Sequence, residues 1–359
     1  MTQRERQILN LIAANPMISQ QELADSLDIT RSSVAVHISN LLKKGYIAGK
    51  GYVLRTGNYA VVVGGVNVDI GGRSHAKLVE ADSNPGKVSI TLGGVGRNIA
   101  HNMSLLGVDV KMLTAIGEDV YGNRIAESCR TLGIDASRAL RVSDCATSTY
   151  LYIADEAGEM AMALSDMEIC DRITPSYLSA NQQVLQNAQV VVADTNVPTE
   201  TLVYLAENCS APIFCDPVST IKAEKLRPVL NKIHTLKPNR LEAELLSGVE
   251  IHSKADAEAA AKVLLDKGVQ RVFLSMGTEG MYAATAETQI WMENIPGDMV
   301  NTTGCGDSVM AALVWAWIND LDLEETLKAG LAAGSITMES SETINPAMSA
   351  TALKLRMSK

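Results

Sequence analysis

Beyond residue 58, short apolar runs alternate with longer amphipathic stretches. Four of the runs are rich in β-branched residues, and each is followed directly by Gly, Asp or Ser. They are Tyr59–Val63, Val190–Ala193, Pro212–Cys215 and Val272–Leu274. Such runs, with helical patterns of about 10 to 15 residues between them, predict βαβ units and a parallel sheet that is buried on both faces. We therefore expect an α/β sandwich of three layers with a mainly parallel sheet.

Two further stretches, residues 87–92 and 147–164, alternate polar and apolar positions. The second is divided by Asp155–Gly158, which has the composition of a hairpin turn. A period of two predicts strands with one exposed face, so the two stretches together predict a small β-sheet. We expect this sheet to lie over the ligand site as a lid.

The first 56 residues follow another pattern. Apolar residues recur at helical spacing over residues 8–12, which predicts a first helix. Ser19, followed by Glu22, predicts the start of a second helix, and Thr30 predicts the start of a third. The segment Gly45–Arg55 then alternates around a Gly-Lys-Gly turn, which predicts a hairpin.

This order of three helices and a hairpin resembles that of bacterial winged helix-turn-helix regulators. We expect a winged-helix domain over residues 1–56 and a second domain over residues 57–359. In the third helix, Val34, Ile38, Leu41 and Leu42 are expected to face inward. The alternative is a folding or dimerisation module whose charges are merely solvated. The candidate DNA contacts are Arg31, Ser32, Ser33, His37 and Lys50.

Charge separates the two parts of the chain. Residues 1–56 contain seven Lys and Arg against four Asp and Glu, a net charge of +3, whereas the whole chain carries −10. A basic head on an acidic body indicates an anionic partner for the head alone. No stretch has the apolar length of a signal sequence or a membrane span, so we expect a cytoplasmic protein with no membrane partner. Six cysteines without a C-x-x-C pair favour reduced thiols over a zinc site or a disulfide framework.

The segment Asn301–Ser308 carries the strongest chemical signal in the chain. Its glycines lead into Val309–Ile318, an uncharged apolar run that predicts a buried helix. The N–H groups at such a helix start favour a phosphate or a developing oxyanion, and Asp307 stands there as a candidate base. The alternative is a tight turn with Asp307 as a helix cap. The sequence contains no G-x-x-x-x-G-K-[ST] loop, so a nucleotide would be held in another way.

Polar residues at the ends of the predicted strands form a second set of candidates. Ligands of parallel sheets bind beyond the carboxyl ends of the strands, so these residues are expected to surround the site. They are Gly64, Gly65, Asn67, Asp69, Asp194, Asn196, Asp216, Ser219, Lys237, Asn239, Ser275, Gly277 and Gly280.

Four motifs together resemble the ribokinase-like (PfkB) carbohydrate kinase family. They are Gly93–Asn98 continuing through Ile116–Gly122, then Asn239–Glu242, Ser275–Gly280 and Asn301–Ser308. In that order they are similar to the first family signature, its Asn-x-x-Glu motif, its nucleotide-contacting Gly-x-x-Gly turn and its second signature. The resemblance covers about residues 59–350.

The resemblance implies an ATP- and Mg²⁺-dependent kinase in which Asp307 takes the proton from a substrate hydroxyl. Backbone N–H groups of Gly304, Cys305 and Gly306 would stabilise the transferring phosphoryl group. Glu242 would hold Mg²⁺ through water, together with Asn239. The alternative at Asn239 is an ordinary helix cap. The residues implied in nucleotide binding are Asn239, Ser275, Gly277, Gly280 and Thr303.

On the acceptor side, the resemblance implies hydrogen bonds from Asn67, Asp69 and Asn98 to sugar hydroxyls. Gly93 and Gly94 would let the backbone approach the sugar ring. The alternatives are a strand-end cap for Asp69 and an ordinary position at a helix start for Asn98.

Two positions depart from the family pattern. Asn301 stands where the second signature usually has Asp, a residue that commonly helps to place a monovalent cation, so a requirement for such a cation is left open. Cys305 replaces the usual Ala, which an anion hole made of backbone N–H groups tolerates.

Three stretches bear on the substrate. Ser148–Tyr150, Ala163–Ile169 and Asp216–Lys222 look more similar to the pseudouridine and nucleoside kinase branch than to ribokinases. Tyr150, Met162 or Met167 under the lid would pack on a base, and the alternative is that the methionines only fill the core. We expect transfer to a primary hydroxyl, foremost the 5′-hydroxyl of a nucleoside such as pseudouridine, in a homodimer formed through the lid. The alternatives are a free-sugar kinase and a DNA-binding regulator that senses its ligand with the kinase domain.

Overall fold

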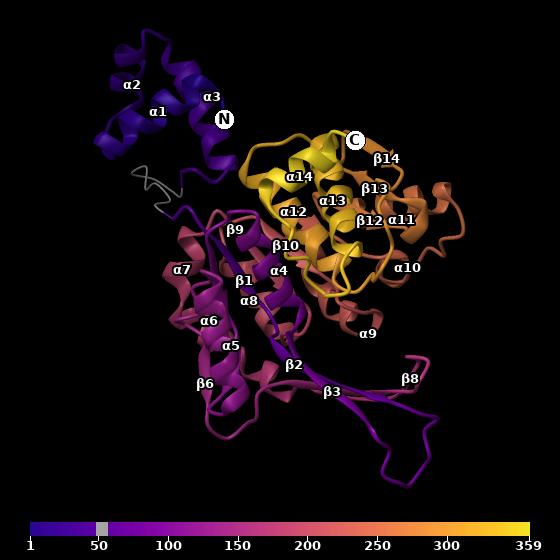
Figure 1. Cartoon of the computed structure of the whole chain (residues 1–359). Coiled ribbons are helices and arrows are strands. Elements are labelled where there is room, and N and C mark those ends of the chain that lie inside the picture. Colours follow the sequence, from indigo (N-terminus) through magenta and orange to yellow (C-terminus); the bar gives the residue numbers. More distant parts are fainter. Residues whose placement is uncertain (48–56) are drawn as a thin grey trace.

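The computed structural model describes residues 1–47 and 57–359 (Figure 1). Its central sheet has the strand order β14-β13-β12-β11-β10-β9-β1-β4. The strands from β12 to β4 are parallel, and β13 and β14 are antiparallel at one edge, so the mainly parallel sheet is confirmed. The bounds are β1 Ala60–Val63, β4 Val110–Leu113, β9 Val190–Asp194, β10 Ile213–Asp216, β11 Thr235–Leu236, β12 Arg271–Ser275, β13 Met281–Ala284 and β14 Gln289–Met292.

Successive residues of a strand point into two different hydrophobic cores. In β1, Val61 and Val63 belong to one core, whereas Ala60 and Val62 belong to the other. Helices cover both faces, which explains why the central strands are almost continuously apolar. The helices on the first face are α6 Pro175–Ala180, α7 Gln182–Asn187, α8 Thr199–Asn208, α9 Thr220–Ala223, α10 Arg240–Ser247 and α11 Lys254–Asp266. Those on the second face are α4 Val95–Leu105, α5 Val120–Thr131, α12 Cys305–Ile318, α13 Leu323–Met338 and α14 Ala350–Met357.

The helix α12 is enclosed over most of its length. Residues 308–316 are all buried, and the helix packs against α4 and α13. Apart from Asp307 it contains no charged residue, which is the composition of a helix surrounded by protein. The predicted buried helix is therefore confirmed, and its packing fixes the position of Asp307 in its first turn.

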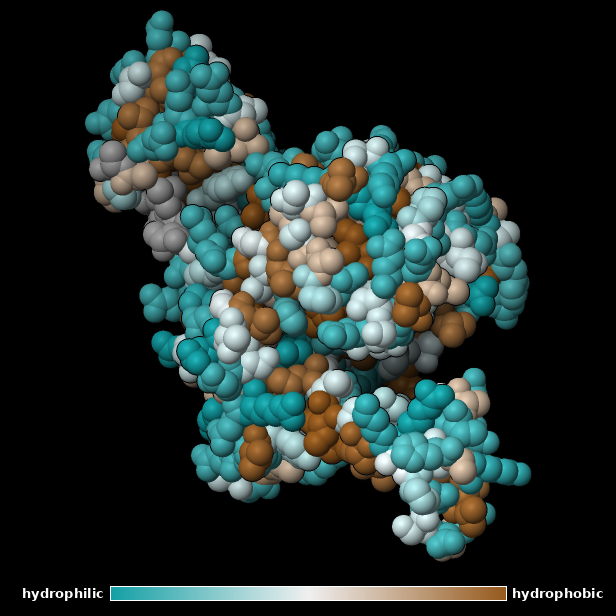
Figure 2. All heavy atoms as spheres, in the orientation of Figure 1, coloured by the Kyte–Doolittle hydropathy of each residue, from teal (hydrophilic) through white to brown (hydrophobic). Residues whose placement is uncertain are grey.

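A second sheet, of four strands, projects from the body as a lid (Figure 1). The surface in Figure 2 carries apolar residues along this lid and at its junction with the body. The order is β3-β2-β7-β8, and β2 is a strand that the sequence pattern did not predict. Asn67 and Asp69, which were expected among the polar residues after the first strand, are the first and third residues of β2. The bounds are β2 Asn67–Ser74, β3 Gly86–Gly93, β7 Thr149–Ala154 and β8 Met160–Asp166; two short strands, β5 Ala115–Gly117 and β6 Leu140–Val142, pair separately.

The N-terminal head contains three helices, α1 Gln3–Ala14, α2 Gln20–Leu27 and α3 Arg31–Lys43, around a core of their own. The predicted helix starts are confirmed, since Ser19 forms a capping box with Glu22 and Thr30 caps α3. The prediction for Leu42 was wrong, because its side chain is 45% exposed. Val34, Ile38 and Leu41 already fill the inward stripe of α3, and Leu42 lies past the edge of that stripe.

The predicted wing is only partly covered by the structure. Residues 48–56, including Lys50 and the Gly-Lys-Gly turn, lie outside the described residues. The predicted boundary between residues 56 and 57 lies at the edge of that gap, so the domain limits stay a prediction. In the head, Arg31 and Ser32 are exposed, while Ser33 and His37 are half-buried.

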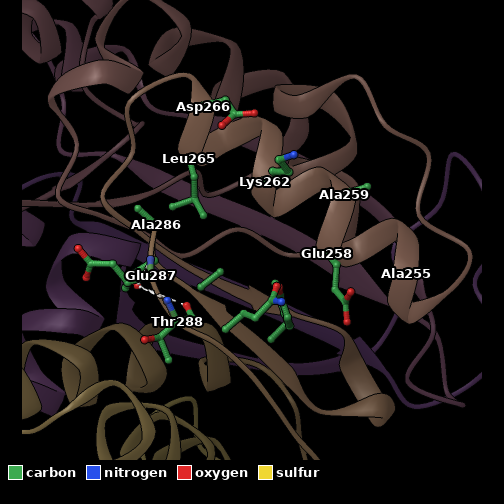
Figure 3. Close-up of a pocket in the computed structure, with 13 residues that line it drawn as sticks. Ala255, Glu258, Ala259, Lys262, Leu265, Asp266, Ala286, Glu287 and Thr288 are labelled. Carbon is green, nitrogen blue, oxygen red and sulfur yellow. Dashed lines mark hydrogen bonds between the residues drawn. The ribbon is translucent and has the colours of Figure 1, made fainter.

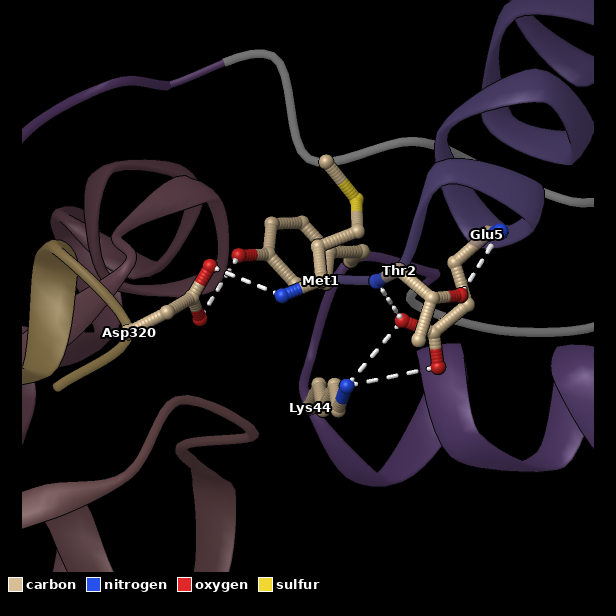
Figure 4. A network of polar contacts seen from close by, with 6 residues as sticks. Met1, Thr2, Glu5, Lys44 and Asp320 are labelled. Atoms are coloured by element: carbon tan, nitrogen blue, oxygen red, sulfur yellow. Dashed lines mark hydrogen bonds and ion pairs between the residues drawn. The ribbon is translucent and has the colours of Figure 1, made fainter. Parts of the chain in front are cut away.

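The head contacts the body through Asp320, in the turn after α12 (Figure 4). Its carboxylate accepts hydrogen bonds from the amine of Met1, at 3.0 Å, and from the hydroxyl of Tyr46, at 3.4 Å. Within the head, Lys44 Nζ lies 3.0 Å from a carboxylate oxygen of Glu5. None of the helices in the described part of the chain is long and apolar enough to span a membrane.

Candidate active site

The carboxyl ends of three neighbouring strands bring charged side chains together. Asp194 ends β9, Asp216 ends β10 and pairs with Asp194 in the sheet register, and Lys237 follows β11 directly. Lys237 Nζ lies 3.2 Å from Asp216 Oδ2, and both side chains are less than 8% exposed. Burial lowers the pKa of Lys237, but the charges of Asp216 and Glu242 raise it, and it stays above its usual value. The sequence had marked these strand ends as candidates without assigning the pair a role.

Asp307 lies in the first turn of α12, opposite this pair. Its Oδ2 accepts a hydrogen bond from Asn98 Nδ2 of α4 at 2.9 Å, so its carboxylate does not cap the helix. Burial raises the pKa of Asp307 to about 7, helped by the charges of Asp216 and Asp194 and opposed by Asn98 and Lys237. A carboxylate with this proton affinity is suited to accept a proton near neutral pH.

The turn before Asp307 requires glycine. Gly304 has a φ of 84°, and a Cβ there would lie 2.1 Å from the carbonyl oxygen of Thr343. Among the described residues, no acceptor is found for the backbone N–H groups of Gly306 and Asp307. The N–H of Cys305 instead donates to Thr302 O at 3.3 Å, so it would have to leave that bond to serve an anion.

Cys305 and Asn301 are the two departures from the family signature. Burial and the charge of Asp307 raise the pKa of the Cys305 thiol to about 11, which keeps it protonated and weakly nucleophilic. Asn301 Nδ2 donates to Ser341 O at 3.2 Å, and its Oδ1 accepts from the N–H of Thr303 at 3.0 Å. Both ends of the Asn301 amide are therefore engaged.

A cavity of about 500 Å³ opens beside Asp307. Thr302 lines it, whereas Thr303 is exposed and does not, so the expected role of Thr303 stays a prediction. The expected residues that line the cavity are Asn239, Glu242, Ser275, Gly277, Gly280, Cys305, Gly306 and Asp307. Val95, Met299, Leu331 and Met338 add apolar wall.

Asn239 and Glu242 form a capping box at the start of α10. Asn239 Oδ1 accepts from the N–H of Glu242, and Glu242 Oε2 accepts from the N–H of Asn239, both at 2.9 Å. The cap that was weighed as an alternative for Asn239 is therefore present. It also holds the Glu242 carboxylate against the cavity, where burial raises its pKa while the Asn239 N–H and Lys237 oppose the rise.

The expected acceptor-side residues lie on β2 and at the start of α4. Asn67 Nδ2 donates to Asp69 Oδ1 at 2.6 Å, and burial raises the pKa of Asp69. Asn98 Oδ1 is buried and, among the described residues, has no hydrogen-bond partner. Gly93 and Gly94 are packed against β2 itself, since a Cβ on Gly93 would lie 2.2 Å from Asp69 Oδ2. None of these five residues lines the 500 Å³ cavity. Asn98 nevertheless contacts both regions, since its Nδ2 donates to Asp307 and its backbone N–H donates to Gly94 O at 2.8 Å.

The strand register separates the lid residues that were expected to pack on a base. Asp69 pairs with Tyr150, so these two side chains share one face of the lid. Met162 pairs with Ile153, which lies an odd number of residues along β7 from Tyr150. The side chain of Met162 therefore points to the opposite face of the lid from Tyr150 and Asp69. The expectation for Met162 was wrong because alternation alone does not tell which face of a lid is inward. Met167 is half-buried and its role stays a prediction.

A separate cavity of about 540 Å³ lies between α11 and the β13–β14 hairpin (Figure 3). Glu258, Lys262, Asp266 and Glu287 line it together with smaller side chains. It includes none of the expected site residues. The phosphoryl-transfer chemistry is therefore sought at Asp307.

Comparison with known proteins agrees with this geometry. Residues 58–350 match the family described as "pfkB family carbohydrate kinase", and residues 1–48 match "Winged helix-turn-helix DNA-binding". The chain is 38% identical to "Uncharacterized sugar kinase YeiI" of Escherichia coli K12 over 98% of this chain and 97% of that protein. It is 40% identical to "Pseudouridine kinase" of the same organism over 82% of this chain and 95% of that protein.

A solved structure, "Carbohydrate kinase from Agrobacterium tumefaciens", aligns with a TM-score of 0.76 at 26% identity. The alignment covers 84% of this chain and 97% of that one, which confirms the ribokinase-like fold. The expected enzyme class, a phosphotransferase with an alcohol acceptor, is confirmed by the family match and these relatives. The chain belongs to the pfkB family of carbohydrate kinases, in which it is a sugar or nucleoside kinase that carries a winged helix-turn-helix head.

Proposed function

We propose that this protein transfers the γ-phosphoryl group of ATP to the 5′-hydroxyl of a nucleoside such as pseudouridine. The observation that carries the proposal is the position of Asp307 between two groups of polar side chains. On one side lies the 500 Å³ cavity with the free N–H groups of the α12 start. On the other side, Asn98 donates to Asp307 from α4, and Gly93, next to the start of that helix, packs against Asn67 and Asp69.

In this proposal Asp307 accepts the proton of the acceptor hydroxyl as that oxygen attacks the phosphorus. The backbone N–H groups of Gly306 and Asp307 receive the negative charge of the transferring group. One such donor is worth about 2.7 to 4 kcal/mol of transition-state stabilisation. Asn98 orients the carboxylate through its Nδ2, and its unpaired Oδ1 is available to a substrate hydroxyl.

The donor side fits ATP with Mg²⁺. The described residues contain no cluster of three or more His, Cys, Asp or Glu that would hold a metal ion by itself. This fits Mg²⁺, which keeps much of its water and binds through phosphates and one or two carboxylates. Glu242, at the cavity wall, would hold it through water, and the ion would neutralise charge on the phosphates.

Two observations favour a nucleoside over a free sugar as acceptor. The relative named "Pseudouridine kinase" is 40% identical over most of the body. Tyr150 shares the lid face of Asp69 and presents an aromatic ring on which a base can stack. The sugar-kinase name of the other relative keeps a free pentose as the alternative.

Comparison of kcat/KM for pseudouridine, uridine and ribose tests the acceptor class. We expect pseudouridine to be the best of the three, with the product phosphorylated at the 5′ position in its ³¹P NMR spectrum. A Tyr150→Ala variant should lose activity on the nucleoside but keep that on ribose. A preference for ribose in the wild-type protein would instead support the sugar-kinase alternative.

We further propose that the head binds DNA and that the protein is a homodimer. The net charge of the head is positive, and Arg31 and Ser32 are exposed at the start of α3. A two-fold pair of heads would suit a palindromic site. The lid face opposite Asp69 is strongly apolar and supports a dimer contact: Val88, Ile90, Leu151, Ile153, Met162 and Leu164 are 37% to 67% exposed.

The regulator alternative can be tested through DNA binding by a variant that lacks the catalytic base. Asp307→Asn would leave ligand-dependent DNA binding intact if the body acts mainly as a sensor. Gel-shift assays with genomic fragments, with and without nucleoside, measure this directly. DNA binding that is the same with and without nucleoside would contradict a role as a sensor.

A further inference from the structure

The buried pair of Lys237 and Asp216 has no assigned role in the reaction described above. We propose that Lys237 is a catalytic residue whose ammonium group contacts the γ-phosphoryl group during transfer, and that Asp216 positions it. This inference rests on the proposed kinase function and names a further residue of the same site.

The position of Lys237 Nζ supports this contact. A Cβ on Gly306 would lie 3.3 Å from Lys237 Nζ, so the ammonium group adjoins the backbone of the α12 start. Lys237, Gly306 and Asp307 all line the 500 Å³ cavity. The positive charge and the free N–H of Gly306 therefore converge on one place, where a phosphoryl group beside Asp307 would lie.

Lys237 lies in a strongly anionic part of the site. Asp194, Asp216, Glu242 and Asp307 surround the strand ends, and Lys237 is the cation that is buried among them in the described part of the chain. A buried ion pair contributes little stability compared with apolar side chains of the same volume, because both charges lose their water. A triphosphate brought into the same cavity adds negative charge, and Lys237 is the group placed to offset it.

The loop that follows Asp216, at the end of β10, is strained. Val218 has a φ of 64°, which is a rare and unfavourable conformation for a β-branched residue. Three contacts hold this conformation: Val218 N–H donates to Asp216 Oδ1 at 2.9 Å, Ser219 N–H donates to Pro217 O at 2.6 Å, and Thr195 Oγ1 donates to Pro217 O at 2.5 Å. Val218 also lines the cavity. Strain of this kind persists where surroundings fix a functional geometry, and here it fixes the carboxylate that holds Lys237.

The proposed contact leaves the atom balance of the reaction unchanged. The acceptor O–H bond breaks and its proton goes to Asp307, a bond forms between the acceptor oxygen and the γ-phosphorus, and the bond to the β-phosphate oxygen breaks with its electrons leaving on ADP. Lys237 keeps its proton throughout. Its charge acts on the equatorial oxygens, where negative charge accumulates during transfer.

Lys237→Met tests the proposal by removing the charge and keeping much of the volume. We expect kcat to fall by about 10² to 10³, the range for one lost donor, with little change in the KM of the acceptor. Lys225→Met is the matched control: Lys225 Nζ donates to the carbonyl oxygens of Thr195 and Val197 nearby but does not line the cavity. The control should keep the wild-type kcat.

Nucleotide binding by calorimetry gives a readout that needs no acceptor. Lys237→Met should weaken binding of Mg²⁺ with the non-hydrolysable ATP analogue AMP-PNP much more than binding of Mg²⁺ with ADP, because only the former carries the γ-phosphate. Equal losses for both nucleotides, or a kcat close to that of the wild type, would overturn the proposal. Lys237→Arg, which keeps the charge, should recover part of kcat, and it remains a test if the Met variant does not fold.

Asp216→Asn tests the positioning role. We expect a smaller loss of kcat than in Lys237→Met, and no further loss when the two changes are combined, because both act through one ammonium group. Additive losses would contradict this arrangement. A failure of the kinase function itself would be recognised separately, as a wild-type protein that binds AMP-PNP yet turns over no acceptor.

Discussion

At the scale of single residues, the site is governed by the proton affinity of Asp307. Burial is the largest cause that raises the pKa of this carboxyl, and the nearby Asp216 and Asp194 act in the same direction. The Asn98 hydrogen bond and the charge of Lys237 oppose them, and the resulting pKa is about 7. At neutral pH the protonated and the ionised form of Asp307 are therefore both populated.

This balance predicts the pH dependence of the reaction. The ionised form of Asp307 is the active one, so activity is retained above its pKa and lost as the pH falls through about 7. We expect kcat/KM to fall about tenfold for each pH unit below that value, as for a single essential base. Initial rates from pH 5 to pH 9 measure the profile. An acid limb near pH 4, as for an exposed aspartate, would contradict the environment described for Asp307.

Asn301 leads to a second prediction, on monovalent cations. The side chain is neutral and both ends of its amide are bonded, to Ser341 O and to the N–H of Thr303. It thus supplies no negative charge to a cation. We expect turnover to be the same in potassium chloride and in choline chloride at equal ionic strength. A marked activation of turnover by potassium would contradict this prediction. If the Asn301→Ala variant were activated to the same or a greater extent, groups other than Asn301 would bind the ion.

Residue-level prediction from sequence succeeded where a motif fixed both type and spacing. Asp307, Gly306 and the Asn239–Glu242 pair lie together at the cavity, as expected from their motifs. The Lys237–Asp216 pair received no role, because the ion pair depends on the register of β10 and β11, which a single sequence does not specify. The same limit applies to Met162, whose face is set by pairing with β7.

At the scale of elements, α12 and the strand ends position the site, and β2 of the lid carries Asn67 and Asp69. Helix α12 was predictable because it has no charged residue after Asp307, and a helix that is apolar on all sides is buried in the protein. Strand β2 was not, because Gly71 and Gly72 weaken its pattern and its polar start resembles a loop. Its pairing with β3 and β7 across the lid overrides this weak local preference.

The apolar outer face of the lid predicts the behaviour of a surface variant. Ile90→Lys with Leu164→Lys places two charges on this face, and we expect a dimer to dissociate because buried charges without partners are costly. Light scattering after size-exclusion chromatography measures the mass. Lys substitution of Val120, an exposed apolar residue of α5 outside the lid, is the matched control and should leave the mass unchanged. A wild-type protein with the mass of a monomer would contradict the proposed dimer.

At the scale of the whole molecule, the head and the body have separate hydrophobic cores and meet through a small polar contact at Asp320. The head was predictable in outline, because its caps and apolar spacing are local signals. Its contact with the body was not, because Tyr46 and Asp320 are far apart in the sequence and neither carries a motif.

Separate cores predict that the body works without the head. Deletion of residues 1–56 should leave kcat and KM close to those of the full chain, since none of the described head residues, 1–47, lines the 500 Å³ cavity. The same deletion should abolish DNA binding. Steady-state kinetics of the two proteins make the comparison. A large loss of kcat in a folded, truncated protein would show that the head takes part in catalysis.

The central claim is that Asp307 is the base of an ATP-dependent phosphoryl transfer to a nucleoside. The most direct test measures ATP consumption by the wild-type protein and by Asp307→Asn over a panel of nucleosides and pentoses. We predict turnover with a nucleoside, foremost pseudouridine, and a loss of about 10² to 10⁴-fold in the variant. Absence of turnover with every member of the panel, or equal rates for the two proteins, would contradict the account. Thermal stabilisation by a nucleoside without turnover would instead support a sensor.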